Sequence, residues 1–410
     1  MDKPFKPIAT EQRIALLDCV RGFSLAGICL ANLVSFAGLY VMTADQILAL
    51  PWPVADRIAL FLIDCFIEGK FYTLFSLLFG IGFGLQSARA AHHPRSFAVF
   101  WLRRMAVLCM FGLIHMFVIW YGDILTLYSL MGLMLLAFRN TSSAWLLRWV
   151  GILLLMPLLI QLVWFQTTDH PFWQSLAVVK TRLQAQWGYM GWTLFDMRSS
   201  NHVVDILASN VLNAVTRPMA YLQSGRPFQV LGQFLLGYWL AREILPRLPD
   251  LHPTLNKLAW PTAIIGLSCS AIYALIKAQT GLPQSTGLVG LAQSLVYHLG
   301  CTTLALYYLI LIERGSRSTA WQSRLQWLQP LGRVPLTNYI GQSCIALWVF
   351  YGYGLAWMGR LPFVALIPLM VAIILLQRTA SHQWLRHQPQ GPLERLWRAF
   401  SYPRPLFAQP

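Results

Sequence analysis

Long apolar runs separated by short polar stretches dominate this sequence. Ten such runs, each of roughly 15 to 25 residues, lie at 20–42, 71–87, 97–118, 124–138, 144–165, 226–241, 258–277, 287–312, 335–354 and 361–377. A helical run of this length crosses a bilayer and satisfies its own backbone hydrogen bonds, as lipid requires. Of the 410 residues, 57% are hydrophobic and only 11% are charged, which excludes a single water-soluble core. We therefore predict an all-α, polytopic integral membrane protein with about ten transmembrane helices.

The basic residues are sorted between the two sides of this scheme. Apart from Arg21 inside the first run, 21 of the 31 Lys and Arg residues fall on the side that holds both termini, and nine fall on the other side. Because positive charge is retained in the cytoplasm, we expect cytoplasmic N- and C-termini. The net charge of +16 is therefore mostly a topology signal, and we expect no nucleic-acid partner, because the charges form no continuous basic surface.

The spacing of the runs divides the chain into three parts. Residues 1–165 form an N-terminal membrane bundle of five spans, and residues 226–400 form a C-terminal membrane bundle. Between them, residues 166–225 mix Trp, Tyr and Phe with polar residues, which is typical of an amphipathic segment at the outer interface. The stretch 203–241 is ambiguous, because it fits either an interfacial helix or the first part of one long broken helix.

The first span carries three polar side chains that share one face. Asp18 and Arg21 are one helical turn apart, and Asn32 follows Arg21 by eleven residues, which almost restores the register. An intrahelical Asp18–Arg21 pair that anchors the helix end is one interpretation. The other is the wall of a polar cavity in which Arg21 reaches an anionic ligand near the inner surface.

The third span repeats this arrangement. Arg103 and Arg104 lie at its cytoplasmic end, and His115 follows Arg104 by eleven residues, about 16 Å along the axis. A lone intramembrane histidine is often a hydrogen-bonded structural group. Asp123, in the outer turn that follows, makes general base catalysis by His115 the alternative, because a neighbouring carboxylate raises the basicity of an imidazole.

Two further groups of polar residues lie near other spans. Glu68 and Lys70 precede the second span, and they are either members of the same outer site or a simple interfacial ion pair. In the ninth span, Asn338 and Gln342 share a face above Arg333, which is typical either of interhelical hydrogen bonding or of a polar cavity. We expect His115, Arg21, Arg104 and Asn338 to line one cavity.

Two motifs that often bind ligands have a structural explanation here. Gly80, Gly82 and Gly84 lack the strand and the βαβ unit of a dinucleotide site, so we expect close helix packing instead. The seven cysteines show no C-x-x-C spacing, and we expect neither a metal site nor disulfides.

Several motifs resemble those of a known family. They are Leu17–Gly22 with Asn32, Lys70–Phe83, Arg103–His115, Tyr121–Leu125, Leu235–Arg242 and Gly332–Tyr339. Their order and spacing resemble the YeiB-like bacterial inner-membrane proteins, whose C-terminal half is the domain of unknown function DUF418. More distantly, Asp18, Arg21 and Gly22 resemble the Asp-x-x-Arg-Gly opening of the membrane acyltransferase superfamily. Many sugar O-acyltransferases of that superfamily carry a histidine late in the same helix, where this chain has Asn32.

The resemblance implies a multi-pass protein of the bacterial inner membrane that transfers an acyl group. The acyl-CoA-type donor is a cytoplasmic co-substrate, no cofactor is bound, and the acceptor is an envelope glycan or lipid. The donor phosphates are assigned to arginines, which form forked hydrogen bonds with phosphate: Arg21, Arg103, Arg104 and Arg333. Catalysis is assigned to His115, Asp123 and Glu68, and the cavity's other polar groups are Asp18, Asn32, Lys70, Asn338 and Gln342. The alternative function is a secondary transporter or permease of a small solute.

Overall fold

The computed structural model describes residues 14–90, 94–167, 170–281 and 284–402, and all regular structure within these ranges is helical. Each of the ten predicted runs overlaps a helix, although the bounds differ by several residues at some ends. These helices are α1 (Ala15–Phe36), α4 (Lys70–Arg89), α5 (Pro94–Ile114) continued by η2 (His115–Ile119), α6 (Leu125–Met134) continued by η3 (Leu135–Phe138), α7 (Ser143–Gln166), α11 (Arg226–Trp239), α12 (His252–Thr280), α13 (Gly287–Ser316), α15 (Pro335–Phe350) and α16 (Leu366–His387).

Six segments in the described ranges are long and apolar enough to cross a membrane. They are α1, the α5–η2 segment Ser96–Ile119, α7, α12, α13 and the segment Phe363–His387, which joins η6 (Phe363–Ala365) to α16. The α6–η3 segment is apolar but shorter. The chain is therefore a polytopic α-helical membrane protein, as the sequence predicts. The terminal residues 1–13 and 403–410 lie outside the described residues.

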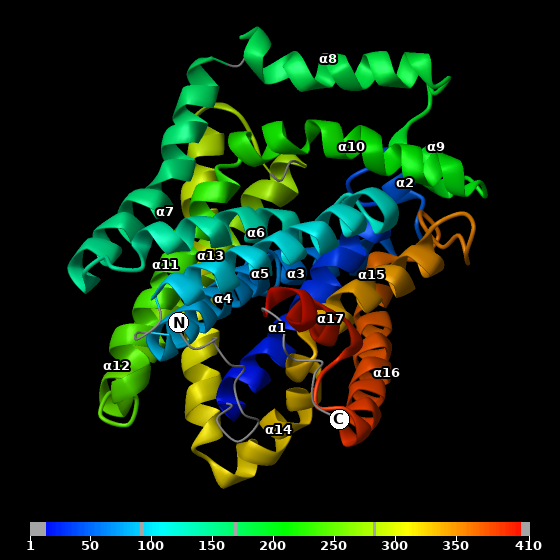
Figure 1. Ribbon diagram of the computed structural model, residues 1–410. Coiled ribbons are helices and arrows are strands. Elements are labelled where there is room, and N and C mark those ends of the chain that lie inside the picture. Colours follow the sequence, from blue (N-terminus) through cyan, green and yellow to red (C-terminus); the bar gives the residue numbers. More distant parts are fainter. Residues whose placement is uncertain (1–13, 91–93, 168–169, 282–283, 403–410) are drawn as a thin grey trace.

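The remaining helices connect and cover this bundle. They are α2 (Ala44–Leu48), α3 (Pro53–Phe66), α8 (Pro171–Gln186), α9 (Leu194–Ser199), α10 (Val203–Gln223), η4 (Leu240–Ile244), η5 (Leu245–Arg247), α14 (Thr319–Arg333) and α17 (Pro392–Ser401). Helices α8 and α10 lie side by side across one end of the bundle, and α14 lies at the other end (Figure 1). A left-handed residue, Gly225 (φ 61°), separates α10 from α11, so the ambiguous stretch forms two helices.

Glycines bring α4 and α11 into close backbone contact. A Cβ atom at Gly80 would collide with the carbonyl oxygen of Phe234, and one at Gly237 would collide with that of Leu77. Gly84 likewise faces Ala241. The prediction of close helix packing is therefore confirmed for Gly80 and Gly84 but not for Gly82, where an added Cβ would meet only Gln86 Nε2, at 3.9 Å.

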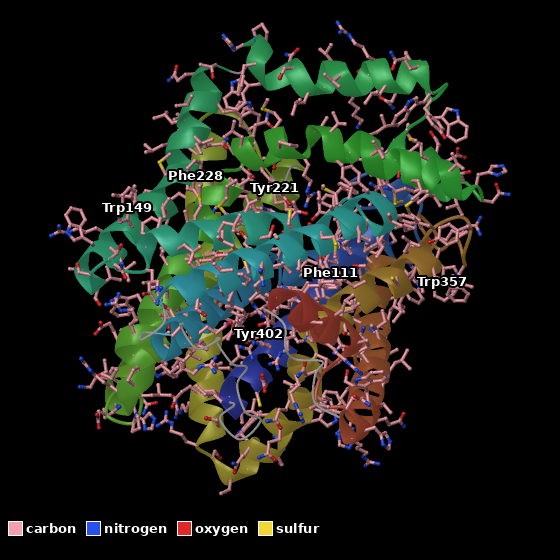
Figure 2. All side chains as sticks on the ribbon, viewed as in Figure 1. Phe111, Trp149, Tyr221, Phe228, Trp357 and Tyr402 are labelled. Atoms are coloured by element: carbon pink, nitrogen blue, oxygen red, sulfur yellow. The ribbon has the colours of Figure 1, made fainter. Side chains whose placement is uncertain are left out.

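The predicted N-terminal and C-terminal bundles share one core. Its largest cluster combines Leu25 of α1, Phe83 of α4, Trp101 of α5, Phe234 of α11 and Tyr339 of α15. Many apolar side chains of the long helices point outward instead, and Trp149 of α7, which is 40% exposed, lies at the outer edge of the bundle (Figure 2). Such a broad exposed apolar surface is what a bilayer covers.

Candidate functional site

The first cavity, about 410 Å³ in volume, gathers arginines from five helices. They are Arg21 of α1, Arg89 of α4, Arg104 of α5, Arg333 of α14 and Arg398 of α17. The topology prediction places four of them on the cytoplasmic side, and Arg21, which it left out of the count, near the inner surface. We refer to this space as the inner cavity.

Both carboxylates of the inner cavity already have partners. Asp18 Oδ1 lies 2.6 Å from Arg21 Nη1, so the predicted intrahelical pair forms, and both residues also line the cavity. Glu394 of α17 closes the N-terminus of α15: it accepts hydrogen bonds from the amides of Leu336 (2.7 Å) and Thr337 (3.0 Å) and from the Thr337 hydroxyl (2.6 Å). These amides have no acceptor within their own helix. The balance of charge in the cavity is therefore positive.

Trp397 of α17 seals one side of the inner cavity. Its indole Nε1 donates to the carbonyl oxygen of Arg104 at 2.8 Å, and the Arg104 guanidinium lies 3.7 Å from its ring centre. This cation–π contact orients Arg104 without neutralising its charge.

The second cavity, about 380 Å³, combines a wall of aromatic rings with five other polar side chains. These side chains are Asn32, Ser35, Glu68, Arg217 and Arg226. Among the described residues, the Glu68 carboxylate takes part in no hydrogen bond or ion pair. Lys70 does not pair with it: Lys70 Nζ donates to the carbonyl oxygen of Asp64 at 2.5 Å. The predicted alternative of an interfacial Glu68–Lys70 pair is therefore wrong, because Lys70 is turned into the protein core and is 1% exposed. We refer to this space as the outer cavity.

The two cavities lie back to back. Phe75 and Phe79 of α4, Pro335 of α15 and Trp397 of α17 line both of them. An apolar partition of three rings and one proline therefore separates the arginines of the inner cavity from the polar groups of the outer cavity.

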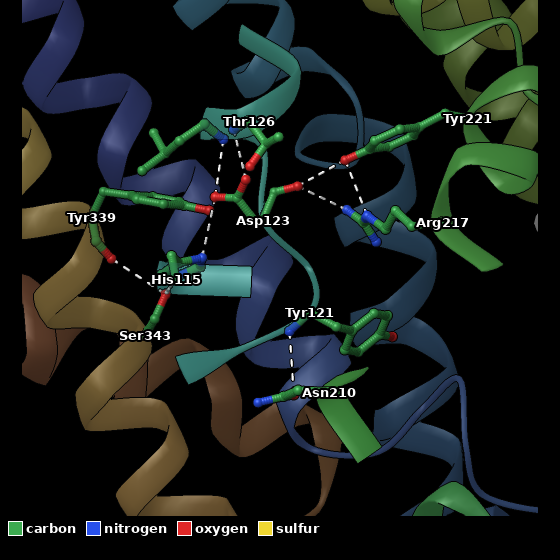
Figure 3. A network of polar contacts seen from close by, with 10 residues as sticks. His115, Tyr121, Asp123, Thr126, Asn210, Arg217, Tyr221, Tyr339 and Ser343 are labelled. Carbon is green, nitrogen blue, oxygen red and sulfur yellow. Dashed lines mark hydrogen bonds and ion pairs between the residues drawn. The ribbon is translucent and has the colours of Figure 1, made fainter. Parts of the chain in front are cut away.

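His115 lies behind the wall of the outer cavity and is fully buried. Its Nε2 is 2.9 Å from Ser343 Oγ of α15, and its Nδ1 is 3.3 Å from Asp123 Oδ1, although this second contact lacks the direction of a hydrogen bond. The Tyr339 ring, which lines the outer cavity, lies 5.1 Å from the imidazole, centre to centre (Figure 3). His115 also starts the π-helical turn η2, a feature frequent at functional sites.

Asp123 joins His115 to the outer segment. Its carboxylate accepts from the amides of Leu125 (3.0 Å) and Thr126 (2.7 Å), which caps α6. Its carbonyl oxygen accepts from Arg217 Nη2 (3.1 Å) and the Tyr221 hydroxyl (2.8 Å), both on α10 (Figure 3). Asp123 therefore has a structural role that leaves its carboxylate beside His115.

The polar residues of the ninth predicted span face α16 and line neither cavity. Asn338 Nδ2 donates to Ser381 Oγ at 3.1 Å, and Gln342 Nε2 donates to Gln377 Oε1 at 3.0 Å. Gln377 Nε2 in turn donates to the carbonyl oxygen of Asn338 at 2.9 Å. Interhelical hydrogen bonding, one of the two interpretations, describes their contacts.

The expectation of one cavity lined by all four residues is wrong. Arg21 and Arg104 line the inner cavity, whereas His115 and Asn338 line neither space. The reason is that α15 packs against η2, so that Tyr339 stands between His115 and the outer cavity. Arg103, although adjacent to Arg104, is exposed and lines neither cavity.

Several residues of the two cavities were not predicted as site residues. Arg217 and Arg226 entered the sequence analysis only as topology charges, and Trp397 and Glu394 belong to a helix that it did not predict. Ser343 is adjacent to Gln342, and its place beside His115 depends on how two distant helices pack. Within the described ranges, no group of three or more His, Cys, Asp or Glu side chains is arranged to hold a metal ion.

Comparisons with known proteins place the chain in a family. The model of the family described as "Protein of unknown function (DUF418)" matches residues 240–404. The chain is 31% identical to the uncharacterized protein YxaH of Bacillus subtilis (strain 168), over 97% of this chain and 96% of that protein. It is 26% identical to the uncharacterized protein YeiB of Escherichia coli (strain K12), over 94% of this chain and 96% of that protein. No solved structure matches the chain. With a relative of this identity along nearly its full length, the chain belongs to the YeiB-like DUF418 family of membrane proteins.

Proposed function

We propose that this protein is an acyltransferase of the bacterial inner membrane. It takes an acyl group from a cytoplasmic acyl-CoA-type donor and delivers it to an envelope glycan or lipid at the outer face. The observation that supports this most strongly is the pair of cavities with a common wall, one lined by arginines and the other by polar and aromatic groups. A transfer between two compartments needs two such sites with a thin barrier between them.

The inner cavity suits the phosphates of the donor. Arg21, Arg104 and Arg333 come from three different helices, and guanidinium groups make bidentate hydrogen bonds to phosphate oxygens. Both carboxylates of this cavity have partners, so they leave a net positive field for an anion. The narrow thiol-bearing arm of the donor would pass the partition at Phe75 and Trp397.

The outer cavity suits the acceptor. In the proposed step, an acceptor hydroxyl or amine attacks the thioester carbonyl carbon, a C–O or C–N bond forms and the C–S bond breaks. We assign the removal of the acceptor's proton to Glu68, whose carboxylate faces the cavity without a protein partner, and the proton then goes to the departing thiolate. The Asn32 amide is the donor that would stabilise the developing oxyanion.

His115 is a positioning residue in this proposal. It is fully buried and connects the Asp123 turn to Ser343, while Tyr339 separates it from the outer cavity. It therefore acts on the acceptor through the placement of Tyr339 and of the Asp123 turn, whose carbonyl oxygen binds Arg217 of α10.

Binding of acyl-CoA to purified protein in nanodiscs tests the donor site. The probes are acetyl-CoA and palmitoyl-CoA, and the proteins are wild type, Arg104→Ala and Arg103→Ala. We expect Arg104→Ala to weaken binding at least about tenfold, the loss of one charge-assisted contact. Arg103→Ala is the matched control: it removes an adjacent positive charge that is exposed and lines neither cavity, and binding should stay near wild type.

A transporter is the second candidate, because a common partition could also open to pass a solute. Vesicles containing the protein distinguish the two functions. If the wild type binds and hydrolyses no acyl-CoA while the vesicles show solute flux, the acyltransferase proposal is wrong. If acyl-CoA is consumed and Glu68→Gln stops its consumption without weakening its binding, the proposal is supported.

A further inference from the structure

A group of buried hydrogen-bond donors without acceptors lies behind the outer cavity. The Tyr121 hydroxyl lies close to the guanidinium of Arg198 of α9, which is 0% exposed, but none of the three guanidinium nitrogens makes a well-directed hydrogen bond within the described residues. The same holds for Trp120 Nε1, Asn210 Nδ2 and the Tyr351 hydroxyl, all buried. Buried polar groups in proteins nearly always have partners, and an unpaired buried charge is the most costly exception.

These donors belong to one neighbourhood. The Arg198 guanidinium carbon lies 4.6 Å from the Tyr121 ring centre and 5.9 Å from that of Tyr351. Asn210 accepts from the amide of Tyr121 at 3.3 Å through its oxygen, which leaves its NH₂ group free (Figure 3). The Phe36 ring lies between Trp120 and Tyr351: its centre is 4.5 Å from the centre of the Trp120 ring and 5.7 Å from that of the Tyr351 ring. Side chains with such donors, from four separate segments, thus lie around Tyr121 and Phe36.

The charges around this region are positive. Burial lowers the pKa of Lys180 on α8, and the charge of Arg198 lowers it further. Burial raises the pKa of the Tyr121 phenol, but the charges of Arg198 and Arg217, together with the polar contacts of the phenol with Arg198 and Ser35, outweigh this effect, so that the pKa is lowered overall. Both observations indicate a local field that favours negative charge.

No carboxylate of the covering helices neutralises Arg198. Asp196 of α9 binds the backbone amide and the hydroxyl of Thr193, each at 2.7 Å. Asp205 of α10 accepts from the hydroxyls of Tyr189 (2.6 Å) and Ser200 (2.5 Å). The described residues contain no ion pair of Arg198, so its charge is without a counter-ion from these ranges of the protein.

We propose that Arg198, Trp120, Asn210 and Tyr351 form a binding site for a small free anion of the size of chloride. A monovalent ion suits a site with one charged donor and several neutral ones. Arg198 is fully buried and lines neither cavity, which favours a free ion over the headgroup of a larger ligand. The anion holds α9 and α10 against the Trp120–Tyr121 turn, which forms part of the outer cavity. The proposal does not depend on acyl transfer.

Equilibrium binding of chloride-36 to the full chain in nanodiscs of zwitterionic lipid, with gluconate as the background anion, tests this site. We expect saturable binding of about one ion per chain at this site, as one charged donor can hold, and Arg198→Met should remove that component. Arg182→Met is the matched control, because Arg182 is an exposed arginine of the same outer segment, and it should keep the component. Arg104→Ala should also keep it, which separates this site from the inner cavity.

A second variant covers the case in which Arg198→Met does not fold. Asn210→Asp supplies a fixed carboxylate in place of the ion, and its melting temperature should become independent of chloride, whereas that of the wild type should rise with chloride. The proposal is overturned if the wild type binds no chloride saturably, for example because a Tyr121 phenolate supplies the counter-charge. It is also overturned if the bound chloride disappears in Arg104→Ala and persists in Arg198→Met.

Discussion

The two cavities differ in how the protein uses its charged groups. In the inner cavity, both carboxylates are engaged within the fold: Asp18 pairs with Arg21, and Glu394 caps α15. In the outer cavity, the Glu68 carboxylate has no such partner among the described residues, and it faces the open space. The inner cavity therefore depends on its carboxylates for its shape, whereas the outer cavity holds its carboxylate ready for a ligand. Removing a carboxylate from the inner cavity should therefore lower stability, whereas removing Glu68 from the outer cavity should impair function and leave stability nearly unchanged.

The largest effect on stability is expected at Glu394. Glu394→Ala removes three hydrogen bonds, leaves two amides of α15 without an acceptor, and should lower the free energy of unfolding by about 2–3 kcal/mol. Glu68→Ala should change it by less than about 0.5 kcal/mol. Unfolding titrations in mixed micelles measure both values. Equal losses in the two variants would show that Glu68 is also a structural carboxylate.

The arginines allow a second comparison, now on ligand binding. Arg104→Gln should weaken binding of acetyl-CoA about tenfold or more, because one charge-assisted contact to phosphate is lost. Arg226→Gln, in the outer cavity, should leave donor binding unchanged and impair only the transfer of the acyl group. Separate measurements of donor binding and of acyl transfer distinguish these outcomes. If Arg226→Gln weakens donor binding as much as Arg104→Gln does, the two cavities work as one site.

The partition between the cavities gives a smaller effect. Trp397→Phe keeps an aromatic ring but removes the hydrogen bond to the Arg104 carbonyl, and should cost about 1 kcal/mol of unfolding free energy. Trp384→Phe is the matched control: Trp384 Nε1 also donates to a carbonyl at 2.8 Å, that of Gln390, but the residue is 43% exposed and lines neither cavity. Its loss should stay below about 0.5 kcal/mol. The same unfolding assay compares the two, and equal losses would show that the partition is not a rigid part of the fold.

Part of this architecture could be predicted from the sequence. The apolar runs located ten helices because hydrophobic length is a local property, and the Asp18–Arg21 spacing located one wall of the inner cavity. Trp397 and Glu394 could not be predicted in the same way. They lie on α17, a short amphipathic helix outside the runs, and their roles depend on contacts with Arg104 and Thr337, which are distant in sequence.

For His115, the sequence predicted the position along the helix but not the separation of the side chain from the cavity. The eleven-residue spacing relates it correctly to Arg104 along one helix, but only the packing of α15 puts Tyr339 between the imidazole and the outer cavity. Arg198 is the extreme case: the sequence shows an ordinary basic residue of a polar segment, and its complete burial follows from the way α9 meets the end of α15, where the Gly352 amide donates to the Arg198 carbonyl at 2.9 Å.

The smallest effect is expected in α8, α9 and α10, the helices at the end of the bundle opposite α14. Hydrogen bonds from Ser200 and Tyr189 lower the pKa of Asp205, and no such bonds form in the unfolded chain. A carboxyl group whose folded pKa lies below its unfolded value of about 3.9 adds stability above that value, and this contribution is lost as the pH falls through the folded pKa. Because the group is near the surface, the contribution should stay below about 0.5 kcal/mol.

Asp205→Asn tests this contribution through the pH profile of stability. At pH 7 the wild type should be slightly more stable than the variant. The difference should shrink as the pH falls below about 4, because the carboxyl group takes up a proton in the unfolded chain before it does so in the folded protein. Amide hydrogen exchange over residues 189–205 measures the local effect, which a melting curve of the whole protein would average out. A difference that stays constant from pH 7 to pH 3 would show that Asp205 holds α10 by packing and not by its charge. In that case Asp205 would have a purely structural role, like the two carboxylates of the inner cavity.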